Sequence, residues 1–241
     1  MIEYFRFNFG IKCLGEITWA HAVNNTEKFE RYLNSRDAMF IESDILLAKD
    51  GTPIAAHPPA SESNLVLADL LAGMKTSRQG LKLDFKDPKA VEPSLDLLKQ
   101  AGLAQPVLLN ADILKGPGGK SSKFEANEFI DRCLSFYSQG ILSLGWTTTN
   151  NADGEYSKAD VSEMLRLCEG LEEVTFPIRA CLLISSWQNL QSLISKASYS
   201  LTIWNNERVN PELMEWIKKH TDPEKTMYDL IDADRNPLRL R

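Results

Sequence analysis

The sequence has 241 residues, of which 43% are hydrophobic and 25% charged, and its net charge is −6. This composition is ordinary for a water-soluble globular protein and provides enough apolar side chains for a full core. Lysine and arginine form no long cluster, so we expect no nucleic-acid partner. No window reaches the ~20 consecutive apolar residues of a bilayer-spanning helix, so we expect no transmembrane segment.

The first 16 residues have no continuous apolar stretch and carry Glu3 early, which is unlike a signal peptide. The chain has four cysteines, which form no C-x-x-C pair and fit no zinc spacing. They fall mostly in apolar stretches, so we predict free, largely buried thiols: Cys13, Cys133, Cys168 and Cys181. A reducing compartment, the cytoplasm, is the simplest setting for such a protein.

Short β-rich apolar runs alternate with longer helical patterns along the whole chain. The predicted strands cover residues 15–21, 38–47, 80–87, 105–113, 141–149, 173–183, 199–206 and 225–232. The predicted helices cover residues 25–35, 63–75, 91–102, 123–140, 157–171, 186–197 and 210–220. Eight such alternations in a chain of this length indicate an α/β protein, a single (β/α)8 TIM barrel over residues 1–241.

A doubly wound open sheet is the alternative fold. A nucleotide-binding sheet of that kind normally has a glycine-rich turn after its first strand, and none follows residue 21. The segment "GPGGKSS" at 116–122 lacks the spacing of a phosphate-binding loop, so we interpret it as a flexible loop.

Acidic side chains mark the second and third predicted strands. Glu42 and Asp44 are two residues apart and therefore share a face, as do Lys82, Asp84 and Lys86. The carboxyl ends of barrel strands meet at one rim, where three converging carboxylates would repel one another without a cation. Carboxylate oxygens suit Mg²⁺ or Ca²⁺, so we predict one divalent metal held there by the three carboxylates, with help from Lys86.

Two of the three histidines, His21 and His57, flank this acidic set in sequence order. A pair of histidines beside a metal is typical of a general acid and a general base, and a metal in a basic pocket favours a phosphoester substrate. His220 ends a surface helix, where the helix dipole is a sufficient explanation.

Each of these features also has a simpler explanation. The E-x-D pair is compatible with a solvated edge, Asp84 with an exposed salt-bridge ladder, and His57 with an ordinary loop. Trp204 is compatible with a residue that only caps the core. Arg179 lies within an apolar run, and it is harder to explain without a function because a buried arginine needs a partner.

The order of these motifs resembles the glycerophosphodiester phosphodiesterases and the sphingomyelinase D-like phospholipases, which are metal-dependent (β/α)8 barrels. The resemblance is carried by His21, Glu42–Asp44, Asp50–Gly51, His57, Asp84–Lys86 and Trp204. It implies two catalytic histidines, three carboxylate ligands of Mg²⁺ or Ca²⁺, a phosphate contact from Lys86 and a pocket wall from Trp204. The phosphodiesterases usually have arginine and glycine after the first histidine and aspartate after the second, whereas this chain has Ala22, Val23 and Pro58.

Longer motifs over nearly the whole chain resemble the menorin family, an animal group tied to neuronal morphogenesis and photoreceptor survival. They are "WAHAVN", "IESDILL", "PIAAHPP", "GLKLDFK", "NADILKGPGG", "LSLGWTT", "VTFPIRA" and "SLTIW". Without a recognisable leader or span, the chain is similar to the short, non-anchored branch. The resemblance implies further pocket residues, which are Asn110, Asp112, Trp146 and Arg179, and we expect Lys82 to line the same pocket.

We therefore expect cleavage of a phosphodiester of the glycerophosphodiester or lysophospholipid type. Attack by water would give a monoester, and attack by an internal hydroxyl would give a cyclic phosphate. One alternative is a catalytically silent barrel that binds a phosphorylated ligand or a protein partner. A glycosidase ranks last, because Glu42 and Asp44 adjoin on one strand instead of flanking a sugar from two sides.

Overall fold

The computed structural model describes residues 1–149, 154–232, 234 and 236–238. The strands are β1 (Trp19–Ala20), β2 (Phe40–Leu47), β3 (Pro53–Ala55), β4 (Gly80–Phe85), β5 (Val107–Lys115), β6 (Ile141–Thr147), β7 (Val174–Arg179), β8 (Tyr199–Trp204) and β9 (Thr226–Asp229). The α-helices are α1 (Ile2–Phe9), α2 (Thr26–Tyr32), α3 (Leu67–Met74), α4 (Val91–Ala101), α5 (Ala126–Phe136), α6 (Lys158–Leu167), α7 (Leu183–Leu190) and α8 (Pro211–His220).

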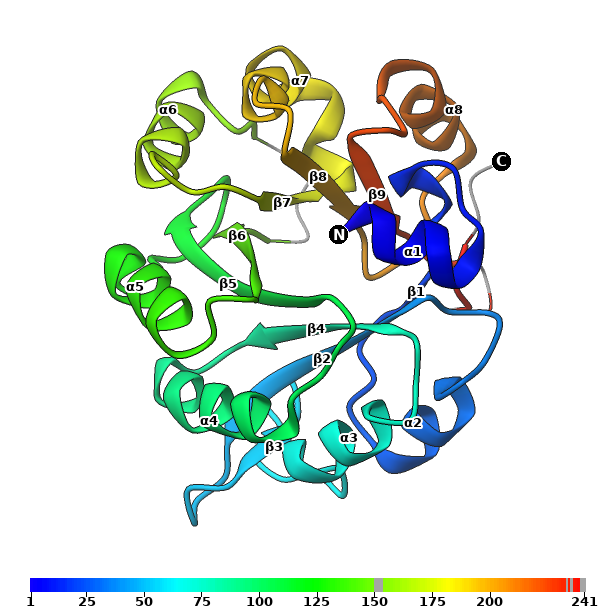
Figure 1. The fold of residues 1–241 in the computed structure, drawn as a ribbon. Helices are drawn as coiled ribbons and strands as arrows, with labels where there is room; N and C mark the ends of the chain where they lie inside the picture. The colour runs from blue at the N-terminus through cyan, green and yellow to red at the C-terminus, as the bar shows by residue number, and fades with distance from the viewer. Residues whose placement is uncertain (150–153, 233, 235, 239–241) are drawn as a thin grey trace.

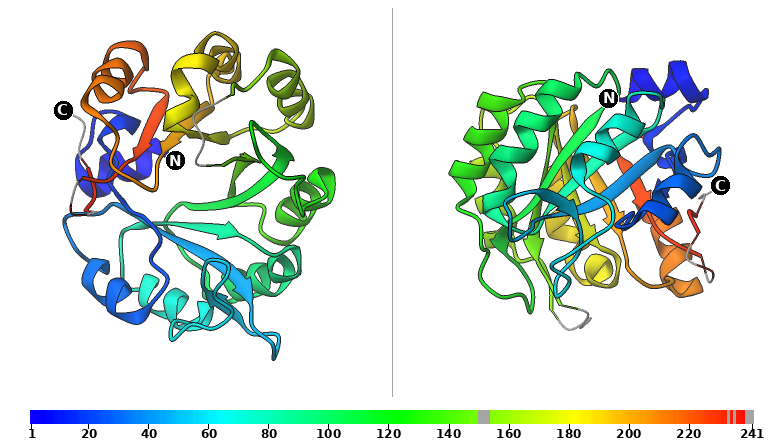
Figure 2. Two further views of the ribbon diagram at one scale, coloured as in Figure 1. Left: turned by 180° about the vertical axis from the view of Figure 1, so that it is seen from behind. Right: turned by 90° about the horizontal axis from the view of Figure 1, so that it is seen from below.

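Eight strands run parallel in the order β1-β2-β4-β5-β6-β7-β8-β9. Viewed end-on they form a nearly closed ring, in which β9 lies beside β1 (Figure 1). Helices α2 to α8 surround this ring, as Figures 1 and 2 show from three directions. The predicted (β/α)8 barrel is therefore confirmed, and the doubly wound alternative is excluded.

The first predicted strand is shorter than expected. Only Trp19 and Ala20 pair with β2, while Leu14–Glu16 form a short 3₁₀ turn. Gly15 lies against the segment that leads into β9, and its N–H donates to the Pro223 carbonyl at 2.9 Å. A Cβ atom at this position would lie 2.8 Å from the Tyr228 ring, so the close approach needs glycine.

Two other boundaries differ from the prediction for local reasons. The third helix begins at Leu67 instead of residue 63, because Ser63 and Asn64 hydrogen-bond to Asn24 and Thr26 at the start of α2. The sixth barrel strand, β7, ends at Arg179, and residues 180–182 form a 3₁₀ turn that continues into α7. Arg179 is thus the last residue of its strand instead of lying in the middle of a longer one.

The prediction missed α1. This helix lies across the end of the barrel at which the strands begin (Figure 1). Its Phe5 is buried against Phe40, and Phe40 stacks on Trp19 with ring centroids 4.4 Å apart. The helix therefore closes the end of the barrel opposite to the carboxyl ends of the strands.

The prediction also missed β3. This short strand pairs antiparallel with the end of β2, with Ile45 opposite Ala55 and Leu47 opposite Pro53. The return turn contains Asp50, whose carboxylate accepts the Thr52 N–H at 3.0 Å, and Gly51, whose φ of 88° suits glycine. This hairpin carries the chain back over the carboxyl end of β2.

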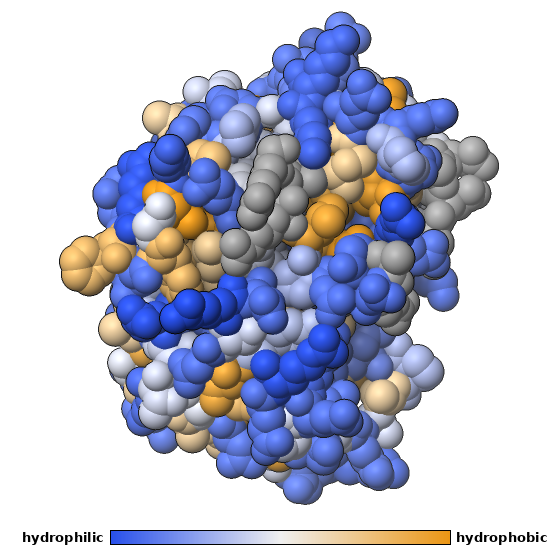
Figure 3. Space-filling model, turned by 90° about the vertical axis from the view of Figure 1, so that its right-hand side faces the viewer, coloured by the Kyte–Doolittle hydropathy of each residue, from blue (hydrophilic) through white to orange (hydrophobic). Residues whose placement is uncertain are grey.

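The main core lies between the strands and the surrounding helices. Figure 3 shows mostly hydrophilic residues on the side that carries α1 and α8, with hydrophobic residues in separate patches. All four cysteines are free thiols, and Cys133 and Cys168 are buried as predicted. Within the described ranges, no helix combines the length and apolar character needed to cross a bilayer.

Candidate active site

A cavity of about 460 Å³ opens at the carboxyl ends of the barrel strands. Most residues predicted from the sequence line it, namely His21, Asp44, His57, Lys82, Asp84, Lys86, Asn110, Arg179 and Trp204. Asp112 also lines the cavity, together with Asn24 and Lys28 from the loop after β1 and the start of α2. The barrel therefore brings residues as far apart in the sequence as His21 and Ile231, 210 positions, to one cavity.

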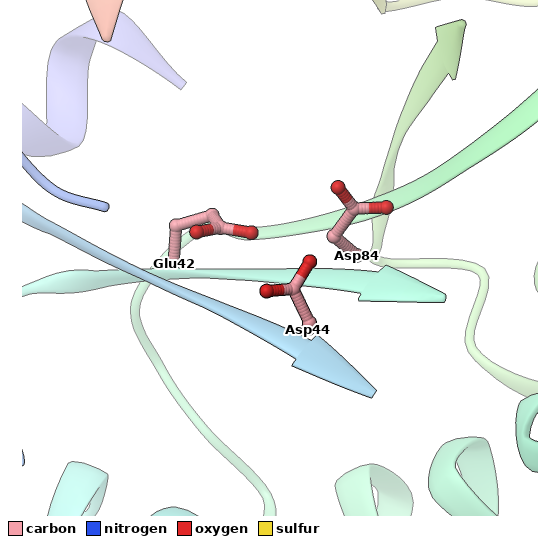
Figure 4. A group of neighbouring side chains, drawn as sticks. All are labelled: Glu42, Asp44 and Asp84. Atoms are coloured by element: carbon pink, nitrogen blue, oxygen red, sulfur yellow. The ribbon is translucent and has the colours of Figure 1, made fainter. Parts of the chain in front are cut away.

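Three carboxylates converge beside this cavity. Strands β2 and β4 are in register, with Glu42 opposite Lys82 and Asp44 opposite Asp84. One oxygen of each of Glu42, Asp44 and Asp84 lies within 4.8 Å of the other two. Figure 4 shows the three groups close together over strands β2 and β4. Oxygen ligands 2.0–2.6 Å from one ion lie at most roughly 5 Å apart, so this donor set fits Mg²⁺ or Ca²⁺.

The electrostatics of the cluster also favour a cation. Burial and the neighbouring charge of Asp44 raise the pKa of Glu42 to about 7. Burial opposes ionisation of Asp84 too, but the Lys86 and Lys82 ammonium groups outweigh it and hold the pKa of Asp84 below its usual range. Lys86 Nζ lies 2.7 Å from Asp84 Oδ2 and 3.2 Å from Asp44 Oδ1. Lys86 thus compensates part of the negative charge of Asp44 and Asp84. Glu42 remains next to the like charge of Asp44.

Asparagine side chains orient two of the carboxylates. Asn24 Nδ2 donates to Asp44 Oδ2 at 2.6 Å, and Asn24 Oδ1 accepts the Asp44 N–H at 3.0 Å. Asn110 Nδ2 donates to Asp84 Oδ1 at 2.8 Å and is itself fixed by the Ser143 hydroxyl at 2.6 Å. Such outer hydrogen bonds are typical of metal ligands held in a set orientation. The sequence reasoning placed Asn110 in the pocket but did not identify Asn24.

His21 is held by a carboxylate that the sequence reasoning gave no role. Its Nδ1 atom lies 2.8 Å from Asp229 Oδ2 and 3.7 Å from Glu42 Oε2. Burial alone would lower the pKa of His21, but the charges of Asp229 and Glu42 outweigh it and raise the pKa to about 9. Asp229 is fully buried, and its Oδ1 atom has no hydrogen-bond partner within the described residues. Its carboxylate is therefore directed at the imidazole.

The residue after His21 has an unusual backbone conformation. Ala22 has a φ of 52°, a region that costs a non-glycine residue roughly 1–2 kcal/mol. Its N–H donates to Glu42 Oε2 at 2.5 Å, and the Lys28 ammonium donates to the carbonyls of His21 and Ala22 at 2.5 and 3.1 Å. These bonds hold the segment after β1 against the carboxylate cluster.

His57 reaches the same cavity by way of the β2–β3 hairpin. The Ala56 N–H donates to the Asp44 carbonyl at 2.9 Å and so fixes the chain next to His57. The imidazole is exposed, and its Nδ1 atom lies 2.7 Å from the Pro58 carbonyl oxygen. Because a carbonyl oxygen can only accept, Nδ1 carries the proton in this hydrogen bond. In neutral His57 the Nε2 atom is then the basic nitrogen.

The opposite wall of the barrel contributes Arg179 and Trp204. The Arg179 side chain is 5% exposed, its guanidinium lies 4.9 Å from the centre of the Trp204 ring, and it donates to Asn206 Oδ1 at 3.0 Å. Trp146, which was also expected in the pocket, is 2% exposed and packs on Tyr156 with ring centroids 5.1 Å apart. Trp146 belongs to the core and is not among the described residues that line the cavity.

Asp112 is placed in the cavity by two local features. The register of β5 and β6 shifts between Asp112 and Leu114, and Gly145 is the partner of Asp112. A Cβ atom at residue 145 would lie 2.6 Å from Asp112 Oδ1, so glycine leaves room for the carboxyl group. Burial raises the pKa of Asp112 to about 7, although the Lys86 charge opposes the shift.

Known structures share this fold. The chain is similar to glycerophosphodiester phosphodiesterase from Agrobacterium tumefaciens, at 10% identity, with a TM-score of 0.55 and coverage of 88% of this chain and 93% of that chain. It is also similar to the enzyme of the same name from Thermotoga maritima, at 13% identity, with a TM-score of 0.51 and coverage of 88% and 94%. At these identities the likeness shows the barrel fold alone.

Sequence comparison gives the family. Human protein FAM151B is 39% identical over 254 aligned residues, which cover 99% of this chain and 92% of that protein. The model of the Menorin N-terminal domain matches residues 14–235. The expected resemblance is thereby confirmed over nearly the full length, and the chain belongs to the menorin family.

Proposed function

We propose that this protein is a metal-dependent phosphodiesterase that cleaves a small phosphodiester of the glycerophosphodiester or lysophospholipid type. The proposal is carried by the convergence of three carboxylates from two adjacent strands on a cavity that two histidines also line. The barrel shared with glycerophosphodiester phosphodiesterases supports it. A cavity of about 460 Å³ suits a ligand of head-group size.

Glu42, Asp44 and Asp84 would hold one Mg²⁺ or Ca²⁺ ion. When bound, such an ion supplies Lewis-acid stabilisation of a phosphoryl oxygen. Lys82, Lys86 and Arg179 surround the same cavity and supply positive charge for the phosphate, while Trp204 forms part of the wall. Asn24 and Asn110 keep two of the carboxylates in place.

The two histidines provide the proton transfers. His57 takes a proton from the attacking water or from a hydroxyl of the ligand, because its Nδ1–H donates to Pro58 and leaves Nε2 as the base. His21 supplies a proton to the leaving oxygen, because the buried Asp229 carboxylate stabilises its imidazolium form. Attack by water gives a monoester, and attack by an internal hydroxyl gives a cyclic phosphate.

Phosphorus NMR of glycerophosphocholine and of a lysophospholipid tests this function. We expect a new phosphorus signal with Mg²⁺ or Ca²⁺ present, and its chemical shift separates the monoester from the cyclic product. The signal should be lost with EDTA and with His21→Ala. His220→Ala is the matched control, because His220 stacks on Trp216 at 4.4 Å on the outside of the barrel. Turnover of neither substrate, or turnover that survives both EDTA and His21→Ala, contradicts the proposal.

A catalytically silent barrel that binds a phosphorylated ligand is the second candidate. It is favoured by Ala22, Val23 and Pro58, which replace the residues that usually follow the two histidines in the phosphodiesterases. In that case His21→Ala would retain ligand binding and biological activity, whereas an enzyme would lose its activity.

A further inference from the structure

A further carboxyl group lines the cavity and has no part in the proposed reaction. Asp112 lies near the end of β5, and among the described residues it is not a member of the group formed by the carboxylates of β2 and β4. Its backbone carbonyl accepts the Ser122 hydroxyl, but its side chain makes no hydrogen bond or ion pair with any residue that the structure describes. The carboxyl oxygens of Asp112 are therefore left for a ligand.

The strand register places Asp112 beside the expected position of the phosphate. Asn110 is the register partner of Asp84, and Asp112 is two residues further along β5, on the same face and nearer the rim. Of the neighbouring charges, that of Lys86 has the largest effect on the pKa of Asp112. Because Lys86 supplies positive charge for the phosphate in the proposed function, Asp112 is close to the groups that the phosphate carries.

A carboxyl group in this position suits a hydroxyl group of the ligand. Its oxygens accept an O–H hydrogen bond, whereas an ionised carboxylate repels the oxygens of a phosphate. The Asp112 side chain is therefore suited to the alcohol part of a phosphate ester. Gly145 leaves the space in which this carboxyl group lies, because a Cβ atom there would be 2.6 Å from Asp112 Oδ1.

A quaternary ammonium group, such as that of choline, fits the cavity less well. Such groups are typically held against the faces of aromatic rings. Trp204 is the only tryptophan, tyrosine or phenylalanine among the described residues that line the cavity, and the Arg179 guanidinium already lies 4.9 Å from the centre of its ring. The cavity is also lined by Lys28, Lys82 and Lys86. These positive charges disfavour a second cation, whereas an uncharged alcohol is not repelled.

We propose that Asp112 determines the specificity of this site, because its carboxyl group accepts a hydrogen bond from a hydroxyl of the alcohol part of the ligand. The site thereby selects phosphate esters of a hydroxylated, uncharged alcohol such as glycerol over those of choline. This inference rests on the phosphate site of the proposed function and narrows its substrate class.

Calorimetric titration of phosphate monoesters into the Mg²⁺-saturated protein tests the inference without requiring turnover. Glycerol 3-phosphate and n-propyl phosphate are a matched pair, because they differ only in the two hydroxyl groups. Glycerol 3-phosphate should bind at least about tenfold more tightly, as expected when a ligand hydroxyl meets a group left unpaired without it. Phosphocholine and phosphoethanolamine should both bind more weakly than glycerol 3-phosphate.

Variants at residue 112 connect this preference to the carboxyl group. Asp112→Ala should reduce the advantage of glycerol 3-phosphate over n-propyl phosphate to less than about threefold. Asp112→Asn should retain part of the advantage, because the amide oxygen still accepts an O–H hydrogen bond. Asp131→Ala, at an exposed position on the helix that follows β5, is the control and should retain all of it. Circular dichroism melts check folding, and Asp112→Leu replaces Asp112→Ala if the latter does not fold.

The outcomes separate this inference from the proposed function. If glycerol 3-phosphate has a smaller advantage than expected, if Asp112→Ala retains the advantage, or if phosphocholine or phosphoethanolamine binds at least as tightly, the inference is wrong and the phosphate site stands. If the preference depends on Asp112 but no phosphodiester is cleaved, the inference holds and the enzymatic function fails. If the wild-type protein binds none of the four esters, both fail.

Discussion

His21 Nδ1, at the end of β1, lies 2.8 Å from Asp229 Oδ2 at the end of β9, 208 residues later in the chain. The two side chains meet because the last strand returns beside the first and nearly closes the barrel. The buried carboxylate fixes the orientation of the imidazole and favours its protonated form.

Replacing Asp229 by asparagine tests this relationship. We expect Asp229→Asn to lower the turnover number by about a hundredfold or more, since an amide stabilises imidazolium poorly and permits the wrong tautomer. The Mg²⁺ affinity should change little, because Asp229 lies outside the group of three carboxylates. Phosphorus NMR rates and Mg²⁺ titration measure the two effects. Asp96→Asn, on the exposed face of α4, is the control, and an unchanged rate in Asp229→Asn would rule out the role.

Because the two histidines are proposed to act as acid and base, the activity lost on replacing each one should depend differently on the leaving group of the substrate. A nitrophenolate leaving group needs no proton, so His21→Ala should lose much less activity on a p-nitrophenyl phosphodiester than on a glycerophosphodiester. His57→Ala should lose a similar factor on both substrates, because the base is still required. Initial rates on the two substrates give this comparison. If His57→Ala were instead the variant that loses much less activity on the p-nitrophenyl substrate, His57 would be the acid and His21 the base.

Metal binding should stabilise the folded protein. Mg²⁺ at a hundred times its Kd adds about 2.7 kcal/mol to the free energy of unfolding, which is roughly 5–11 °C in Tm for a protein of this size. Asp84→Asn should remove most of this shift, since Asp84 is one of the three converging carboxylates. Thermal melts with and without EDTA measure it, with Asp131→Asn on exposed α5 as the control. An equal shift in Asp84→Asn would place the metal elsewhere.

Asp112 should make the stability of the metal-free protein depend on pH. Burial raises its pKa to about 7 in the folded state, above the ordinary value of 3.8, so the folded state favours the protonated carboxyl group. The stability that this group contributes is therefore full below about pH 4 and is lost as the pH rises through 7. The free energy of unfolding of Asp112→Asn, relative to that of the wild type, should therefore rise from pH 5 to pH 8 and then level off. Melts in EDTA across this range test it, and a smaller advantage at pH 8 than at pH 5 would contradict the account.

The sequence was sufficient for the barrel and for the acidic centre because both depend on short-range patterns. The period of two places Glu42 with Asp44 and Lys82 with Asp84 on one face, and neighbouring parallel strands end at the same rim. The expected convergence of the carboxylates therefore follows from local sequence alone.

Other features depend on contacts that no local pattern reveals. Helix α1 is stabilised by the packing of Phe5 on Phe40, and β3 has only three residues, too few for a recognisable period. Asp229 reaches His21 only through closure of the barrel. Likewise the sequence places Lys82 and Lys86 on one face, and only the structure shows that Lys86 is the lysine paired with Asp44 and Asp84.

The central claim is that Glu42, Asp44 and Asp84 hold one divalent cation beside His21. Anomalous diffraction from crystals soaked in Mn²⁺, an oxygen-preferring substitute for Mg²⁺, tests it most directly. We predict one strong peak about 2.0–2.3 Å from an oxygen of each carboxylate, absent in crystals of Asp84→Asn. A map without a peak between the three carboxylates, or with its main peak elsewhere, would contradict the account.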